Sequence, residues 1–250
     1  MRFITTYFLL FGILLMACSS SKPIVEPNDY TLSDKPVSEI ISELPNYSNE
    51  LLTAKGKGRA IVSEPGNNER FNIDFASDTS LSLLKIKNRL GIEGGAMLVD
   101  QDSILMYFKV DKIAQKVSVN DGRLTSLNEL ASINLIDLLH FTLIKENVLQ
   151  VYESDSDYLL RLITDGGATI DKSEMLITEV SQPRSAGLPY STIIYENYGQ
   201  LDEFRLPRKI TIFSADGLSK VIFQVRSLDV NPREIDLELA IPSDINIERL

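Results

Sequence analysis

The chain has 250 residues, of which 44% are hydrophobic and 24% charged, a composition typical of a globular protein rather than a disordered or fibrous one. Lys and Arg number 25 against 35 Asp and Glu, and the resulting net charge of -10 excludes the basic surface that a nucleic-acid-binding protein needs. The single His (His140) and single Cys (Cys18) exclude a His/Cys metal cluster and an internal disulfide within one copy.

The N-terminal residues have the pattern of a bacterial lipoprotein signal peptide. Arg2 supplies a positive charge, and the apolar run at 7–17 is shorter than the roughly 20 residues that a spanning helix needs. The run ends in Leu15-Met16-Ala17-Cys18, which resembles a lipobox, where the Cys is acylated and becomes the new N-terminus. The alternative is a plain signal peptide with a chance Cys, but the chain has its one Cys at this position. We therefore expect a signal peptide at 1–17 and a covalent lipid on Cys18, and no other cofactor.

The segment after Cys18 predicts a tether followed by one domain. Residues 18–35 are rich in Ser and contain few apolar side chains, which is typical of a linker, and residues 36–250 form the folded domain. Ser19, rather than Asp, follows the Cys, which resembles the signal for transfer to the outer membrane. No acidic run of the kind linked to surface export follows it. The expected location is therefore the outer membrane, with the domain facing the periplasm.

A short helix opens the domain. Val37, Ile40, Ile41 and Leu44 follow helical spacing, and prolines border the segment at both ends. One face of this helix is expected to pack on the body of the domain.

From Leu51 onward the apolar residues alternate with a period of two, which predicts antiparallel strands with one buried face. Phe71, Ile73 and Phe75 form one such set. The parity changes between Leu83 and Leu84, which predicts a β-bulge. With the turn signals between the runs, the chain is expected to form about ten or eleven strands.

One longer helix interrupts the strands. Ser126 and Glu129 have the spacing of a capping box, and leucines at helical spacing follow them. The stripe consists of Leu127, Leu130, Ala131, Leu135, Leu138, Leu139 and Leu143. Because the opposite face is also apolar, this helix is expected to lie buried in the curve of the sheet.

None of the polar constellations indicates catalysis. His140 lies within the apolar helix, where a core histidine bonded to a neighbour is the interpretation we favour over a ligand. The pairs Asp100/Asp102 and Asp155/Asp157 lack the glycine and distal Glu of a calcium loop and are typical of hairpin turns. The sequence therefore predicts neither an enzyme nor a metal site.

The segment Leu90-Gly91-Ile92-Glu93, which follows one strand and precedes Ala96-Met97-Leu98-Val99, resembles part of LolB, the outer-membrane lipoprotein receptor. Leu206-Pro207-Arg208 and the stretch from Val230 to Pro242 are similar to the final part of LolB-like and LolA-like lipoprotein carriers. A LolB-like lipoprotein family common in Bacteroidota, with a similar Gly-Ile-Glu segment, is closer still. The resemblance spans roughly residues 37–250 and rests more on the order of elements than on identity.

The resemblance implies a mainly β (α+β) fold: an open, strongly curved antiparallel half-barrel with helices plugging its concave face. Between sheet and helices, such proteins hold an apolar cavity for acyl chains. We expect its walls to include the set Phe71, Ile73, Phe75, Leu135, Leu138, Leu139 and Phe141. In LolB a leucine protrudes to contact lipid, and Leu90 matches that position, with Ile92 assisting. LolB has a proline before that leucine, whereas this chain has Arg89.

Two functions remain open. In the first, the protein accepts acyl chains of lipoproteins or free lipid, received from a LolA-like periplasmic carrier, and helps to deliver them to the outer membrane. In the second, the same fold has a filled core and serves as a structural docking subunit of an envelope complex. Neither function requires a catalytic residue.

Changing Cys18 to Ser tests the anchor. The variant should remain in the aqueous phase of a detergent partition and should lack the added mass of acyl chains, because the thiol that receives the lipid is gone. Identical partitioning of variant and wild type, with no added lipid in the intact mass, would show that Cys18 is not an anchor.

Overall fold

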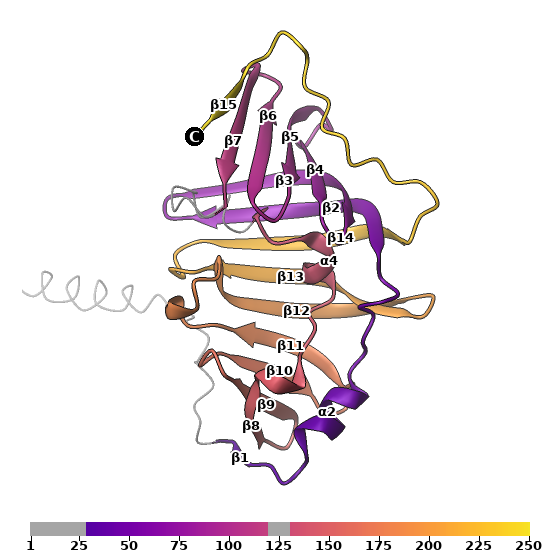
Figure 1. The fold of residues 1–250 in the computed structure, drawn as a ribbon, viewed down its shortest axis with the longest axis vertical. Helices are drawn as coiled ribbons and strands as arrows, with labels where there is room; N and C mark the ends of the chain where they lie inside the picture. The colour runs from indigo at the N-terminus through magenta and orange to yellow at the C-terminus, as the bar shows by residue number, and fades with distance from the viewer. Residues whose placement is uncertain (1–28, 120–130) are drawn as a thin grey trace, which may run out of the picture.

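The structure, a computed structural model, describes residues 29–119 and 131–250. Fifteen strands of this part form one sheet in the order β1-β8-β9-β10-β11-β12-β13-β14-β2-β3-β4-β5-β6-β7-β15. All neighbours pair antiparallel except β15 and β7, which are parallel. The sheet does not close, and it twists strongly between β8 near one end and β7 near the other (Figure 1).

The strands lie mostly in hairpins and meanders. In the first half of the chain they are β1 (Thr31–Leu32), β2 (Thr53–Glu64), β3 (Asn67–Asp78), β4 (Ser82–Lys87), β5 (Glu93–Val99), β6 (Ser103–Phe108) and β7 (Ile113–Ser118). In the second half they are β8 (Val148–Glu153), β9 (Asp157–Leu162), β10 (Gly167–Asp171), β11 (Leu176–Ser181), β12 (Tyr190–Leu201), β13 (Phe204–Ser214), β14 (Lys220–Val230) and β15 (Ile247–Arg249). The described helices are α2 (Val37–Glu43) and α4 (Leu135–Leu139), with 3-10 turns η2 (Lys145–Asn147) and η3 (Arg184–Ala186).

The sheet is mainly β and open, as the sequence predicts, but it has more strands than the expected ten or eleven. The additional strands are short. β10 has five residues, and β1 and β15 have two and three. Segments of this length contain too few residues for an alternation of apolar and polar side chains to be recognised in the sequence. They are strands because they pair with a neighbouring strand. Pairing begins at β1, inside the segment expected to be the tether.

The predicted bulge between Leu83 and Leu84 is wrong. The β3–β4 register runs without a shift from Ser77 opposite Ser82 to Asn72 opposite Lys87. Both positions carry an apolar residue because β4 is covered on both faces. Leu83, 2% exposed, lies on the face opposite Leu84. The C-terminal segment runs along this outer side of the sheet, where Asp236 approaches Lys85 (Figure 1).

The long helix predicted over Leu127 to Leu143 is not continuous in the described part of the chain, where residues 132–134 and 140–143 are not helical. Leu127 and Leu130 lie outside the described residues, and α4 begins only at Leu135. Asn134 caps α4 because its side chain accepts a hydrogen bond from the N–H of Ile136 at 2.8 Å. After α4 the chain continues without helix through residue 143, so Leu143 is buried but not helical.

Contacts with the β3–β4 turn fix the position of α4. The Asn134 amide donates to the carbonyl of Asp78 at 3.0 Å, and the N–H of Leu135 donates to Ser82 Oγ at 3.0 Å. Tertiary hydrogen bonds therefore fix the residue at which α4 starts.

The main hydrophobic core lies on one face of the sheet, here called the inner face and defined by Phe71, Ile73 and Phe75. Ile40 of α2 and Leu139 of α4 belong to the same buried cluster. On β2 the inner face carries Gly58 next to Ala60, and the missing side chain leaves room for the ring of Phe223. Phe223 packs against Phe75 with ring centroids 5.5 Å apart.

Gly58→Ala should therefore destabilise the fold. A Cβ at this position would lie 2.6 Å from Phe223 Cε2 and 2.9 Å from the carbonyl oxygen of Gln224. We expect the free energy of unfolding in urea to fall by about 1–3 kcal/mol, the usual cost of overpacking. Gly94→Ala is the control, because nothing lies within 4 Å of its added Cβ. Equal stability of the two variants would contradict close packing at β2.

Candidate functional site

An apolar cavity of about 360 Å³ lies on the inner face, between the sheet and the segment that leads into α4. Its walls come from β2 to β6, from β13 and β14, and from Leu135 and Leu138 of α4. The lining residues are Ala60, Val62, Phe71, Ile73, Leu84, Ile86, Gly94, Gly95, Ala96, Met97, Met106, Tyr107, Phe108, Ala131, Ile133, Leu135, Leu138, Ile212, Val221 and Phe223.

None of these described residues carries a charge. The volume falls within the range of small-molecule sites, about 300–1,000 Å³, and such a lining offers almost no hydrogen bonds to water. Cavities lined by Leu, Ile and Phe stay dry and take up apolar molecules. Chemically, the cavity can therefore bind an apolar chain, and the Tyr107 hydroxyl is the one titratable side-chain group among these described lining residues.

The structure brings four of the seven predicted wall residues into this cavity. Phe71 and Ile73 lie on β3, and Leu135 and Leu138 lie on α4. Phe75 does not line the cavity, because its ring is 4% exposed and packs on Phe223.

Leu139 and Phe141 contribute to a different, smaller pocket. The reason is the end of α4: the chain leaves helical geometry at His140, so Phe141 no longer follows the helical spacing from which its place was predicted.

Several wall residues were not predicted from the sequence, among them Leu84, Ile86, Met97 and Met106. Strand pairing places them on the inner face: Ile86 lies opposite Ile73, Met97 opposite Leu84, and Met106 opposite Met97. The sequence alone does not show that these residues lie on the same face as Phe71, because that depends on the register of each hairpin.

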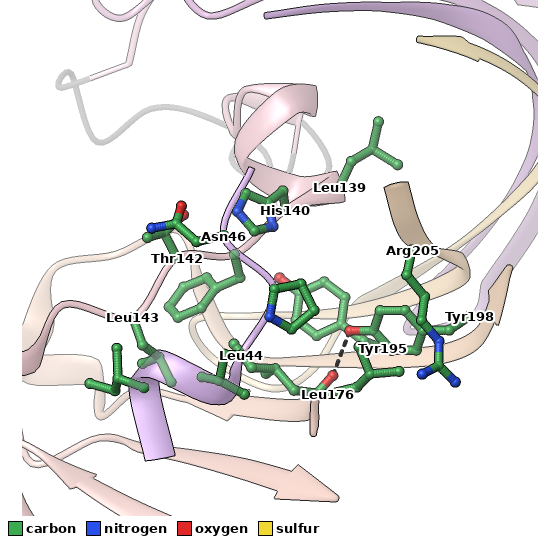
Figure 2. A pocket seen from close by; sticks show the side chains of 14 residues that line it. Leu44, Asn46, Leu139, His140, Thr142, Leu143, Leu176, Tyr195, Tyr198 and Arg205 are labelled. Atoms are coloured by element: carbon green, nitrogen blue, oxygen red, sulfur yellow. Dashed lines mark hydrogen bonds between the residues drawn. The ribbon is translucent and has the colours of Figure 1, made fainter. Parts of the chain in front are cut away.

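The smaller pocket, of about 50 Å³, lies on the other side of α4 (Figure 2). Leu139, His140, Tyr195, Tyr198 and Arg205 are among its lining residues. The Tyr198 hydroxyl donates to the carbonyl of Ile177 at 2.6 Å, drawn as the dashed line in Figure 2. The Tyr195 side chain is 3% exposed and its hydroxyl has no hydrogen-bond partner in the described structure, so burial raises its pKa well above 10. The small volume makes this pocket a packing defect beside the helix rather than a second ligand site.

His140 has a structural role. Its Nε2 accepts a hydrogen bond from the N–H of Tyr47 at 2.9 Å, and its ring lies 5.0 Å from the Tyr47 ring. Burial lowers the pKa of His140, which keeps the ring neutral and able to accept. The interpretation of His140 as a histidine bonded to a neighbour is therefore confirmed, although the neighbour is 93 residues away in the chain.

The turn between β4 and β5 presents the two residues predicted to contact lipid. Leu90 is 84% exposed and Ile92 is 61% exposed. The Asn88 side chain holds the turn by accepting from the N–H of Leu90 at 2.9 Å and of Ile92 at 3.0 Å, and Gly91 supplies the positive φ of +83°. Neither apolar side chain lines the cavity, whose wall at Gly94 and Gly95 begins just beyond this turn.

The acidic pairs Asp100/Asp102 and Asp155/Asp157 lie at hairpin turns, with Asp157 as the first residue of β9. Asp100 Oδ1 accepts from the N–H groups of Asp102 and Ser103 at 2.8 and 2.6 Å, as expected of an Asp that closes a hairpin. Within residues 29–119 and 131–250, no three His, Cys, Asp or Glu side chains gather in a way that could hold a metal ion. A search of the same ranges finds no helix with the length and apolar character needed to span a bilayer.

Neither a protein-family model nor a curated protein sequence matches this chain. Solved structures with a similar fold include the following three. A domain from Vibrio parahaemolyticus assigned to outer-membrane lipoprotein sorting has a TM-score of 0.54 and 13% identity, covering 78% of this chain and 92% of that one. A LolA superfamily protein from Nitrosomonas europaea has a TM-score of 0.53 and 12% identity, with coverage of 80% and 96%. A DUF1329 family protein from Desulfovibrio piger has a TM-score of 0.52 and 10% identity, with coverage of 79% and 90%.

At these identities the similarity shows a shared fold alone. The chain therefore has a fold similar to that of a LolA superfamily protein, which is the kind of fold expected from the resemblance.

The buried His140 predicts a pH-dependent stability. In the unfolded chain the pKa of His140 is near 6.5, and in the folded protein it is lower. The neutral, buried ring therefore stabilises the fold fully above about pH 6.5. This stability is lost as the pH falls from about 6.5 towards the folded pKa. His140→Gln keeps an acceptor for the Tyr47 N–H but does not titrate. Melting temperatures measured between pH 7.5 and about pH 5 should fall more steeply for the wild type than for the variant. Parallel curves would show that His140 remains neutral in both states or is protonated equally.

Proposed function

We propose that this protein binds acyl chains in the cavity on the inner face and takes part in delivering lipoproteins or free lipid to the outer membrane. The observation that carries the proposal is the uncharged cavity of about 360 Å³ in a sheet with the fold of the LolA superfamily. Its activity is binding without catalysis. The cargo consists of the acyl chains of lipoproteins or of free lipid, supplied by a LolA-like periplasmic carrier.

Burial of methylene groups provides the driving force. Each CH₂ moved from water into an apolar site contributes about 0.8 kcal/mol, so a fatty acyl chain can bind without any specific polar contact. Release into a bilayer then costs little, because the chain moves from one apolar environment to another. A cavity that lacks charged side chains suits such an exchange.

The lipid on Cys18 would hold the protein at the periplasmic face of the outer membrane, close to the membrane that receives the cargo. Cys18 lies outside the described residues, so this part of the proposal rests on the lipobox-like sequence. Leu90 and Ile92, exposed on the β4–β5 turn next to the cavity wall, are proposed to contact lipid during transfer. The 84% exposure of Leu90 supports this part of the proposal.

One observation favours the alternative function, a structural docking subunit with a filled core. The inner face over β8 to β12 is closely packed, with Leu160, Ala168, Ile170 and Val180 all 0% exposed. The pocket of about 50 Å³ described above lies beside this packed part of the inner face. The cavity occupies the other half, which is why we place lipid binding there.

A pair of matched variants tests lipid binding. Ile86 lines the cavity on β4, whereas Leu98 lies on the outer face of β5, opposite Leu83. Ile86→Asn should weaken binding of a dansyl-labelled fatty acid about tenfold, because it places an unpaired amide in the apolar wall. Leu98→Asn, with a half-buried side chain of similar size, should bind like the wild type.

Circular dichroism should show that both variants are folded. Mass spectrometry of the wild-type protein extracted from membranes should find lipid bound non-covalently in stoichiometric amount. Absence of bound lipid together with no fatty-acid binding by the wild type would support the docking function instead.

A further inference from the structure

Two hairpin turns lie side by side at the end of the sheet where the cavity wall reaches the surface. They connect β4 to β5, at residues 88–92, and β6 to β7, at residues 109–112. The pairing of β5 with β6 makes them neighbours: Gly95 lies opposite Phe108, and the N–H of Lys109 donates to the carbonyl of Gly94 at 2.9 Å. Both turns lie in the upper part of Figure 1.

Both turns expose large apolar side chains. On the second turn Val110 is 80% exposed, and Phe108 and Ile113 at its base are 41% and 42% exposed. Together with Leu90 and Ile92 they form an apolar tip surface, defined here as these five residues. Single exposed apolar residues are common on proteins, but five gathered on two adjacent turns are typical of an interaction surface.

The charge around the tip surface is opposite to that of the whole protein. Residues 87–93 and 109–113 contain the basic residues Lys87, Arg89, Lys109 and Lys112 against the acidic residues Glu93 and Asp111. Their net charge of about +2 stands within a chain of net charge -10. Lys87 and Lys109 pair with Asp74 and Glu93, whereas Arg89 and Lys112 are exposed and form no ion pair with the described residues. Apolar tips with adjacent free cations are complementary to the surface of an anionic bilayer.

The tip surface is continuous with the cavity. Gly94, Gly95 and Phe108 line the cavity and belong to the bases of the two hairpins. Phe108 is both a wall residue and part of the exposed surface, so an acyl chain in the cavity reaches solvent beside these turns.

We propose that the β4–β5 and β6–β7 turns act together as a membrane-docking surface for anionic lipid, with Val110 inserted beside Leu90 and with Arg89 and Lys112 on the phosphates. The proposal deepens the lipid-delivery function and rests on it, because docking at this end brings the cavity opening to the bilayer. It adds a second hairpin, with Phe108, Val110 and Ile113, to the contact expected at Leu90 and Ile92.

Vesicle flotation tests the docking surface. A form of the chain that begins at Ser19 lacks the lipid, and it keeps every described strand and both buried clusters, since all of these lie after residue 28. It should float with vesicles of phosphatidylcholine and phosphatidylglycerol in equal parts, and less with phosphatidylcholine alone. Binding should weaken with added salt, because the free cations contribute.

Val110→Asp should reduce binding to the anionic vesicles about tenfold, the order expected when one apolar side chain no longer enters an apolar phase. Leu90→Glu should have an effect of similar size. Leu218→Asp is the matched control, because Leu218 is 68% exposed on the β13–β14 turn, away from these hairpins. Lys112→Glu should weaken binding to anionic vesicles and leave binding to neutral ones unchanged.

The two proposals fail in different ways. Val110→Asp should bind the dansyl-labelled fatty acid like the wild type, and Ile86→Asn should still float with vesicles. Flotation of Val110→Asp equal to wild type would overturn the docking surface while leaving cavity binding intact. A shift of Val110→Asp from dimer to monomer in analytical ultracentrifugation, with unchanged flotation, would assign the tip surface to self-association and overturn membrane docking.

Discussion

The pairing of β14 with β2 is the contact on which the rest of the sheet depends. It joins residues near position 60 to residues near position 222, with Val62 opposite Val221 and Ala60 opposite Phe223. Without it the chain would form two separate meanders, β2 to β7 and β8 to β14, each with an exposed edge. The cavity spans this junction, because Phe71 and Leu84 belong to one meander and Ile212 and Phe223 to the other. Loss of the pairing would therefore remove the cavity as well as the continuous sheet.

The two halves of the inner face differ in how they are filled. Over β8 to β13, side chains of the sheet and of α2 and α4 meet in a continuous core, in which Ile40 and Ile210 are fully buried. Over β2 to β6 the strands turn away with the twist of the sheet, and the described helices supply too few side chains to fill the gap. α4 stands at the boundary, with Leu138 toward the cavity and Leu139 toward the smaller pocket. Twist and a short helix thus create the space that binding needs.

The positions of the proposed anchor and the tip surface constrain how the protein lies on a membrane. β1, the first described strand, is at one edge of the sheet, and β5 and β6 are near the other. At about 4.8 Å per strand the separation is about 50–55 Å, whereas the chain from Cys18 to Asp29 can extend at most about 40 Å. If both ends contact one bilayer, the long direction of the sheet must tilt away from the membrane normal.

The sequence by itself determined the local features of this protein. Alternation of apolar residues predicted strands and the inner-face positions of Phe71 and Ile73, proline-bordered helical spacing predicted α2, and the resemblance around Leu90 predicted an exposed turn. Only the tertiary structure decided that Leu83 and Leu84 face two covered sides, that Asn134 starts a helix by bonding across to the β3–β4 turn, and that Leu139 and Phe141 leave the cavity. The physical reason is the distance along the chain over which each interaction acts. Periodicity depends on residues a few positions apart, whereas register, helix ends and an unfilled volume depend on hydrogen bonds and packing between segments about 50 to 180 residues apart.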